Sequence, residues 1–104
     1  MKDKEKFVYR VMDTKEWDDF KKEKKFYGNA FDLESGFIHL STKSQIKDTI
    51  NKYFQDQKNI VILQICETKI RENIKWEISR NNQIFPHLYG FLKLFDVKKV
   101  NNIY

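Results

Sequence analysis

The sequence predicts an α+β fold, with two helices near the N-terminus and strands in most of the remainder. Three observations carry this prediction. Residues 7–12 alternate between two faces as in a strand, two segments behind capping residues repeat apolar side chains at helical spacing, and residues 60–66 form a short apolar run. Helices and strands alternate early and strands follow one another late, which favours α+β.

The first strand and the first helix are predicted from adjoining segments. Residues 7–12 alternate Phe, Tyr and Val with Val, Arg and Met, and they place Arg10 in the middle of a strand. Asp13 then offers a helix N-cap, and Glu16 stands three residues later, where it can complete a capping box. The helix is expected to end near Lys24.

A loop, a short strand and a second helix follow. Residues 26–35 contain a glycine and lead into a turn, so we expect a loop there. Phe37–Leu40 is predicted as a short strand. Thr42 can cap the next helix, with Gln45 at the reciprocal position, and apolar residues recur at helical spacing as far as about residue 55.

The last third of the chain is rich in strands. Ile60–Cys66 is apolar on both faces and is predicted to be a central strand. Ile74–Ile78 alternates, Asn81 and Asn82 form a turn, the segment Ile84–Gly90 follows, and Asp96–Asn102 is predicted as the last strand. We expect these strands to form mixed or antiparallel sheets.

The length and composition predict one domain, residues 1–104, with its core in about residues 7–102. Hydrophobic residues make up 40% of the chain and include nine Phe, five Tyr and two Trp, enough for one two-layer core. The charged content of 34% does not indicate disorder, because apolar residues fall in ordered patterns between the charges.

The net charge of +5 does not by itself predict a nucleic-acid partner. Seventeen of the twenty basic residues are Lys and are scattered, and the one cluster lies in residues 21–25. Nucleic-acid readers concentrate basic residues on one face and often use Arg. A lysine-dominated RNA-binding domain stays open as an alternative, and it predicts affinity that falls steeply with salt.

The sequence predicts a cytoplasmic protein with no membrane span. The charged N-terminus is not followed by an apolar signal core, and no apolar run approaches transmembrane length. Cys66 is the single cysteine, so no intrachain disulfide can form, and its place in an apolar strand predicts a buried thiol.

Arg10 is the first residue that points to chemistry. A guanidinium in the middle of a strand is either buried with a partner or lines the floor of a cleft, because its charge is not left unpaired in a dry interior. A salt bridge to Asp32 and an anion-binding role both remain open.

The segment Gly36–Thr42 is the second such feature. Strand alternation places Phe37, His39 and Ser41 on one face. Ser41 and Thr42 stand where a strand gives way to a helix, a natural place for an anion. Simple helix capping by these hydroxyls, and a structural role for His39, are the alternatives.

The third feature is the segment from Glu77 to Gly90, which contains Arg80, His87 and the single proline. Pro86 restrains the preceding residue to an extended conformation and helps to aim His87. No metal site is predicted, because the His and Cys spacings of known metal motifs are absent. A serine-hydrolase elbow and a glycine-rich phosphate loop are absent as well.

These motifs together resemble an uncharacterised bacterial family, domain of unknown function 952. The resemblance covers nearly the whole chain and rests on motifs that follow in the same order. They are Tyr9-Arg10, Asp32, Gly36–Ser41, Trp76-Glu77 and Phe85–Gly90.

The resemblance implies an ADP-ribosyltransferase-like fold, with more distant similarity to the NAD-dependent RNA 2′-phosphotransferases. Residues 38–42 match the second strand motif of those enzymes, and Arg10 takes the place of their first motif histidine. The resemblance thus implies a cleft between the sheets that binds NAD, as a substrate, or a related nucleotide.

The same resemblance implies roles for single residues. Arg10 would hold a phosphate, His39 and Ser41 would bond the ribose, and Tyr89 or Phe37 would flank a ring. The expected catalytic residues are Glu77 and His39. Glu77 would stabilise the oxocarbenium-like charge that develops as nicotinamide leaves. The full set of expected binding residues is Tyr9, Arg10, Asp32, Phe37, Ser41, Thr42, Arg80, His87 and Tyr89.

Two functions of different classes therefore remain open from the sequence. One is an NAD-dependent ADP-ribosyl transferase or NAD glycohydrolase. The other is a non-catalytic module that uses the same cleft to recognise a small molecule, a nucleotide or a partner protein. Release of nicotinamide distinguishes the two.

Overall fold

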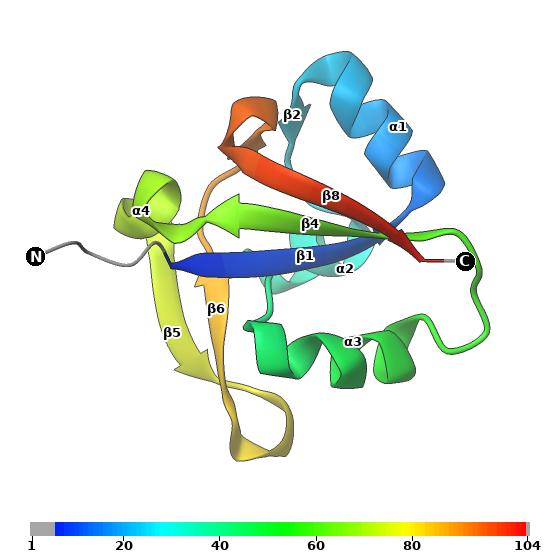
Figure 1. Cartoon of the computed structure of the whole chain (residues 1–104). Coiled ribbons are helices and arrows are strands. Elements are labelled where there is room, and N and C mark those ends of the chain that lie inside the picture. Colours follow the sequence, from blue (N-terminus) through cyan, green and yellow to red (C-terminus); the bar gives the residue numbers. More distant parts are fainter. Residues whose placement is uncertain (1–5, 104) are drawn as a thin grey trace, which may run out of the picture.

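Strands pair only in antiparallel fashion in residues 6–103, the part of the chain that the computed structural model describes. The largest sheet has the order β1-β4-β8, formed by Phe7–Asp13, Ile60–Cys66 and Val97–Ile103 (Figure 1). The prediction that Ile60–Cys66 is a central strand is confirmed. Its apolar character on both faces follows from its position, since each face of the sheet is covered.

Two smaller sheets complete the β-structure of the described residues. One has the order β3-β6-β5, formed by Ile38–His39, Ile84–Leu88 and Ile74–Ile78. The other pairs β2 (Lys25–Phe26) with β7 (Leu92–Lys93). The α+β prediction is confirmed, and of the two expected kinds of sheet the antiparallel one is present. No strand is predicted from the sequence in the segment Ile84–Gly90, whereas β6 is the central strand of its sheet.

The two predicted helices are present. The first, α1, spans Thr14–Glu23, and its predicted capping box is confirmed: the backbone N–H of Glu16 donates to Asp13 Oδ1 at 2.8 Å. The second, α3, spans Ile46–Tyr53 and follows a 3₁₀ turn at Lys43–Gln45. That turn is closed by a bond of 3.0 Å from the Thr42 N–H to Gln45 Oε1.

The prediction of a loop over residues 26–35 is wrong. Helix α2 occupies Ala30–Ser35, and it begins with a second capping box, in which Asn29 and Asp32 exchange backbone-to-side-chain bonds of 3.0 and 2.8 Å. These bonds satisfy N–H groups that a helix of six residues otherwise leaves unpaired. A fourth helix, α4 (Glu67–Ile70), was not predicted either.

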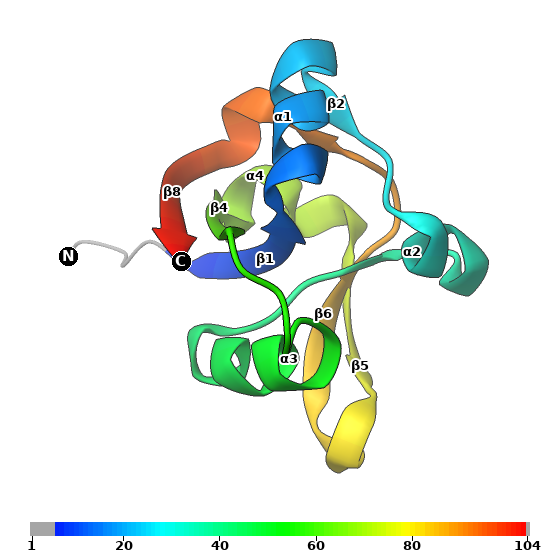
Figure 2. The same ribbon diagram turned by 90° about the vertical axis from the view of Figure 1, so that its right-hand side faces the viewer.

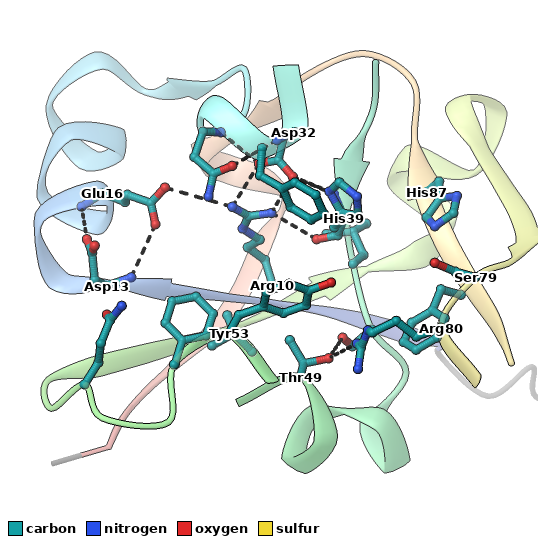
Figure 3. Close-up of a pocket in the computed structure, with 18 residues that line it drawn as sticks. Arg10, Asp13, Glu16, Asp32, His39, Thr49, Tyr53, Ser79, Arg80 and His87 are labelled. Atoms are coloured by element: carbon teal, nitrogen blue, oxygen red, sulfur yellow. Dashed lines mark hydrogen bonds and ion pairs between the residues drawn. The ribbon is translucent and has the colours of Figure 1, made fainter. Parts of the chain in front are cut away.

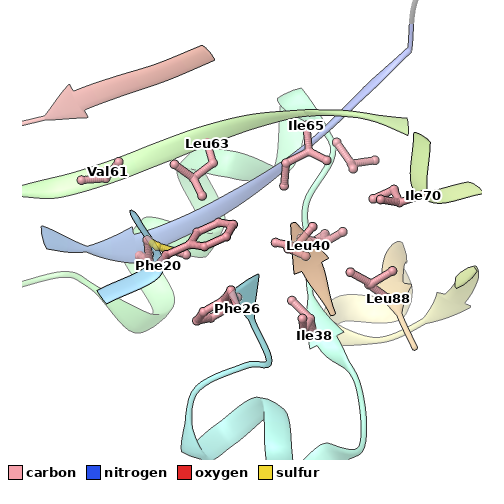
Figure 4. Close-up of a cluster of buried hydrophobic side chains, with 12 residues drawn as sticks. Phe20, Phe26, Ile38, Leu40, Val61, Leu63, Ile65, Ile70 and Leu88 are labelled. Atoms are coloured by element: carbon pink, nitrogen blue, oxygen red, sulfur yellow. The ribbon is translucent and has the colours of Figure 1, made fainter. Parts of the chain in front are cut away.

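Two apolar clusters lie on opposite faces of the first sheet. The larger one packs Val8, Met12, Leu63 and other residues of this sheet against Phe20 of α1 and against the β3-β6-β5 sheet (Figure 4). On the other face, Ile60 and further strand residues pack against α3. Cys66 is buried, as predicted.

β1 is an edge strand, and this edge positions the functional site. Among the described residues, one pair bridges it to the β3-β6-β5 sheet: Tyr9 and Ser41, which follows β3, exchange two backbone hydrogen bonds of 2.8 Å each. The β5–β6 hairpin then projects beside α3 (Figure 2). The space enclosed by β1, α3 and this hairpin is where the cavity described below lies.

The two tryptophans lie in different parts of the fold. Trp17 of α1 is partly buried against the main cluster, edge-on to Phe20 with ring centroids 5.7 Å apart. Trp76 of β5 is half exposed, and with Ile78 and Ile84 it forms an apolar outer face on the hairpin. Among residues 6–103 there is no helix long and apolar enough to span a membrane.

Candidate functional site

A cavity of about 420 Å³ lies at the free edge of β1 (Figure 3). Its walls come from β1, the start of α1, α2, the end of β3, α3 and the β5–β6 hairpin. The volume is within the range of pockets that hold small molecules. The cavity therefore collects side chains from segments that are far apart in the sequence.

Asp32 is the centre of the polar network in one wall. Its side chain is 1% exposed, and its Oδ1 accepts bonds from Arg10 NH1 at 3.0 Å, His39 Nδ1 at 2.6 Å and the His39 backbone N–H at 3.0 Å. Oδ2 accepts from the Asn29 backbone N–H at 2.8 Å and pairs with Arg10 NH2 at 2.9 Å. A buried carboxylate with this many donors is fully satisfied.

These donors govern the ionisation of Asp32. Burial raises the pKa of the carboxyl, but the hydrogen bond from His39 and the charge and hydrogen bond of Arg10 outweigh it and lower the pKa to about 2. A carboxyl whose pKa is depressed in the folded state stabilises the fold above its ordinary pKa, and this stabilisation is lost as the pH falls toward the folded value.

We expect ionisation of Asp32 to contribute about 2 kcal/mol to the free energy of unfolding above about pH 4, and this contribution to disappear as the pH falls to about 2. The measurement is a titration of the side-chain carboxyl carbon by NMR, together with urea denaturation over the same pH range. A midpoint at the ordinary value of 3.8 would contradict the expectation.

Arg10 is held by this network. Its side chain is 5% exposed, NH1 also donates to the His39 carbonyl at 3.1 Å, and the guanidinium lies 4.9 Å from the centre of the Phe26 ring. The salt bridge to Asp32, one of two alternatives from the sequence, is confirmed. Nε of Arg10 is buried without a hydrogen-bond partner in the described residues. The two terminal nitrogens of Arg10 are occupied by their contacts with Asp32 and the His39 carbonyl.

His39 is oriented by Asp32. Because Nδ1 meets the carboxylate, the other ring nitrogen, Nε2, is the one that remains for a ligand in the cavity. The ring stacks on Phe31, with centroids 4.3 Å apart and an interplanar angle of 9°. Its side chain is 25% exposed, so it can meet solvent.

His87 forms a second pair of the same kind. Its Nδ1 lies 2.7 Å from Glu77 Oε1, and the Tyr89 hydroxyl donates to the same oxygen at 2.8 Å. The hydrogen bond with His87, and to a smaller extent the one from Tyr89, lowers the pKa of the Glu77 carboxyl. Phe37 stacks on the His87 ring, with centroids 4.0 Å apart. His87 lines the cavity, whereas Glu77 does not.

Arg80 provides the cationic end of the cavity. Its guanidinium lies over the rings of Tyr53 and Phe85, at 5.2 and 4.7 Å from their centres, and NH2 donates to Thr49 Oγ1 at 2.9 Å. Thr49 Oγ1 lies 2.9 Å from Ser41 Oγ. No carboxylate of the described residues pairs with Arg80. It can therefore receive an anionic ligand group.

Carboxylates occupy the opposite end. Figure 3 shows Asp13 and Glu16 at one end of the cavity and Arg80 at the other. Burial raises the pKa of Glu16, and the charge of Arg10 opposes this rise. Phe31 and Tyr53, which line the cavity between the two ends, are 44% and 41% exposed.

The structure separates the predicted site residues into three groups. Those that line the cavity are Arg10, Asp32, His39, Ser41, Arg80 and His87. Glu77 and Phe37 contact His87 and do not line the cavity, and Tyr89 in turn contacts Glu77 and Phe37. Tyr9 and Thr42 lie outside: the Tyr9 hydroxyl accepts from Gln64 Nε2 at 3.2 Å, and the Thr42 N–H is used by Gln45.

Several lining residues were missed in the sequence. Thr49 had a usable signal, since it shares the inner side of α3 with Ile46 and Tyr53 at helical spacing. Glu16 was noted only as a capping residue, although it also lines the cavity. Phe31 could not be found, because its segment was expected to form a loop. In residues 6–103, no group of three or more His, Cys, Asp or Glu side chains is placed to hold a metal ion.

Comparisons with known proteins place the chain in a structural context. The model of a family described as "Protein of unknown function (DUF952)" matches residues 11–100. The crystal structure of protein CC0527 from Caulobacter crescentus is similar, with 38% identity, a TM-score of 0.88, and coverage of 92% of this chain and 84% of that one.

Two further structures of the same relative agree. A crystal structure of a double methionine variant of CC0527 gives a TM-score of 0.87 with 84% of that chain covered, and its solution NMR structure gives 0.82 with 83% covered. Both are 38% identical to this chain over 92% of its length. No curated protein matches the chain.

Proposed function

The chain belongs to the DUF952 family of proteins of unknown function, and from the cavity described above we propose that it binds NAD or a related nucleotide and cleaves or transfers at the N-glycosidic bond. We further propose that its fold is ADP-ribosyltransferase-like and distantly similar to the RNA 2′-phosphotransferases. The two strand motifs that carry this likeness meet at the Tyr9–Ser41 bridge, which supports the proposal.

The observation that carries the proposal is the opposite charge of the two ends of the cavity. Arg80 stands at one end, and Asp13 and Glu16 stand at the other. NAD has the matching polarity, since a cationic pyridinium is joined through ribose to anionic phosphates. The phosphates would meet Arg80 and Thr49, and the pyridinium would lie toward Glu16.

The middle of the cavity suits the remaining parts of such a ligand. Nε2 of His39 and the Ser41 hydroxyl can bond ribose hydroxyls. The half-exposed rings of Phe31 and Tyr53, with centroids 5.5 Å apart, offer faces to a planar ring. In this arrangement Arg80 holds the phosphate, because the guanidinium of Arg10 is already paired with Asp32.

One observation favours the second candidate, a non-catalytic binding module. Glu77, the carboxylate expected to stabilise the oxocarbenium-like charge, does not line the cavity and accepts bonds from His87 and Tyr89. Its Oε2 carries no hydrogen bond from the described residues. Nicotinamide release by the wild-type protein would favour the enzyme, and binding without release would favour the module.

We expect Arg80→Ala to weaken NAD binding at least tenfold, because the phosphates lose their cation. Calorimetric titration measures the Kd. Arg71→Ala is the matched control, since Arg71 pairs with Glu67 on α4 and does not line the cavity.

A second variant tests the acidic end. Glu16→Gln should weaken binding of NAD more than binding of ADP-ribose, which lacks the pyridinium. Equal loss for both ligands, or an unchanged Kd for Arg80→Ala, would refute the proposed orientation.

A further inference from the structure

Two histidine–carboxylate pairs of the same design place their imidazole rings at the cavity. His39 Nδ1 lies 2.6 Å from Asp32 Oδ1, and His87 Nδ1 lies 2.7 Å from Glu77 Oε1. In neither ring does Nε2 bond to a side chain or backbone group of the described residues. Each pair thus fixes one ring nitrogen and leaves the other for proton transfer.

The two rings are close enough to act on one group. His39 and His87 are directly paired in the β3–β6 ladder, so both rise from the same face of the sheet. Their ring centroids are 5.8 Å apart, and both line the same cavity. Two hydrogen bonds of roughly 2.8 Å can reach different oxygens of one phosphate across such a separation.

We infer that His39 and His87 are a general base and a general acid that hydrolyse a nucleoside 2′,3′-cyclic phosphate. The inference rests on the proposed binding of a nucleotide in this cavity and does not depend on cleavage of an N-glycosidic bond. His39 is the base, because its more exposed ring can meet water, and His87 is the acid.

The leaving group decides between phosphorus and glycosidic chemistry for this pair. When the N-glycosidic bond of NAD breaks, nicotinamide departs as a neutral molecule and needs no proton. A second histidine acting as a general acid is therefore not required for that reaction. A ribose oxygen leaves phosphorus as an alkoxide and does need a proton. Two titratable rings facing one cavity therefore match a phosphodiester.

The surrounding groups support a small phosphodiester. Arg80 lies over Phe85, which alternates with His87 on the same face of β6, so a cation stands beside the acid. It can stabilise the charge that grows on the phosphoryl oxygens. A cavity of about 420 Å³ suits a mononucleotide, and the strained five-membered ring of a 2′,3′-cyclic phosphate is a diester contained within one nucleotide.

The proposed step is balanced without a further reactant. His39 Nε2 takes a proton from water as its oxygen forms a bond to phosphorus. The bond from phosphorus to the 2′ or 3′ oxygen breaks, and that oxygen takes the proton from His87 Nε2. The product is a nucleoside 2′- or 3′-monophosphate, and proton exchange with solvent restores both rings.

The test is to incubate the full chain with adenosine 2′,3′-cyclic phosphate and to follow the monoester by ³¹P NMR. His39→Asn and His87→Asn are the variants of choice, because an Asn amide can still donate to the carboxylate while Nε2 is removed. Each should lower kcat at least a hundredfold, the usual range for general acid–base groups. The Kd for adenosine monophosphate should rise by less than tenfold, because each variant loses one hydrogen bond to the ligand, and Arg71→Ala, outside the cavity, is the control.

A second substrate separates the two roles. Thymidine 5′-(4-nitrophenyl phosphate) has a leaving group that needs no proton, so His87→Asn should lower its hydrolysis less than tenfold, whereas His39→Asn should still lower it at least a hundredfold. The reverse pattern would overturn the assignment of base and acid. Glu77→Gln, which keeps an acceptor for His87, should lower kcat about tenfold with KM unchanged, as expected of a positioning residue.

The inference and the proposed function fail in different ways. Nicotinamide release without hydrolysis of the cyclic phosphate would overturn the inference alone, and hydrolysis without nicotinamide release would support it. Turnover that persists in both folded histidine variants would also overturn it. If His39→Asn does not fold, as judged by circular dichroism, His87→Asn alone decides. Absence of binding of NAD and of adenosine monophosphate would overturn both.

Discussion

Asp32→Asn is expected to lower the free energy of unfolding by about 3–5 kcal/mol, because it leaves the buried guanidinium of Arg10 without its counter-charge. The same change replaces an oxygen that accepts from His39 with one that carries no charge. Urea denaturation followed by circular dichroism gives the free energy.

A double-variant cycle separates charge pairing from packing. Arg10→Met should also lower the free energy of unfolding by about 3–5 kcal/mol, whereas Arg10→Met combined with Asp32→Asn should lower it by less than the sum of the two single changes. Asp19→Asn is the control, since Asp19 and Lys15 form an exposed pair on α1, so this change should leave the free energy of unfolding nearly unchanged. Simple additivity of the two buried changes would contradict the coupling.

Gly28→Ala is expected to lower the free energy of unfolding by about 2–3 kcal/mol. Gly28 has a φ of +112°, and a Cβ there would lie 2.7 Å from Cβ of Asp32, so the substitution strains the backbone and displaces the centre of the network. Thermal or urea denaturation measures the loss.

Gly36 provides the matched control for this strain. Its φ is also positive, at +89°, but a Cβ there would meet nothing within 4 Å. Gly36→Ala should therefore lower the free energy of unfolding by only about 1 kcal/mol, the price of the left-handed backbone alone. Equal losses for the two variants would show that contact with Asp32 does not matter.

Local signals in the sequence were sufficient for the elements that depend on neighbouring residues. The capping box of Asp13 and Glu16 was recognised because a long amphipathic segment follows it. The same pattern at Asn29 and Asp32 was not recognised, since helix α2 has only six residues and shows no apolar period. A short helix fixed by its cap and by tertiary bonds has little pattern to detect.

The candidate site depends on contacts that no local pattern contains. From the sequence, Arg10 could either pair with Asp32 or bind an anion, and the structure contains the salt bridge to Asp32. The pairing of His87 with Glu77 requires the register of the β5–β6 hairpin, in which Glu77 faces Phe85. The bond from Arg80 to Thr49 requires the hairpin to lie against α3. These relations follow from packing between distant segments.

The placement of the two tryptophans makes the native protein a source of two separate fluorescence signals. Trp17 reports on the junction of α1 with the main cluster, whereas half-exposed Trp76 lies on the outer face of the hairpin whose inner face carries Glu77 and His87. A Trp17→Phe protein would emit from the hairpin alone. Its emission wavelength and quenching by iodide would then record movement of the hairpin during titrations, without any attached dye.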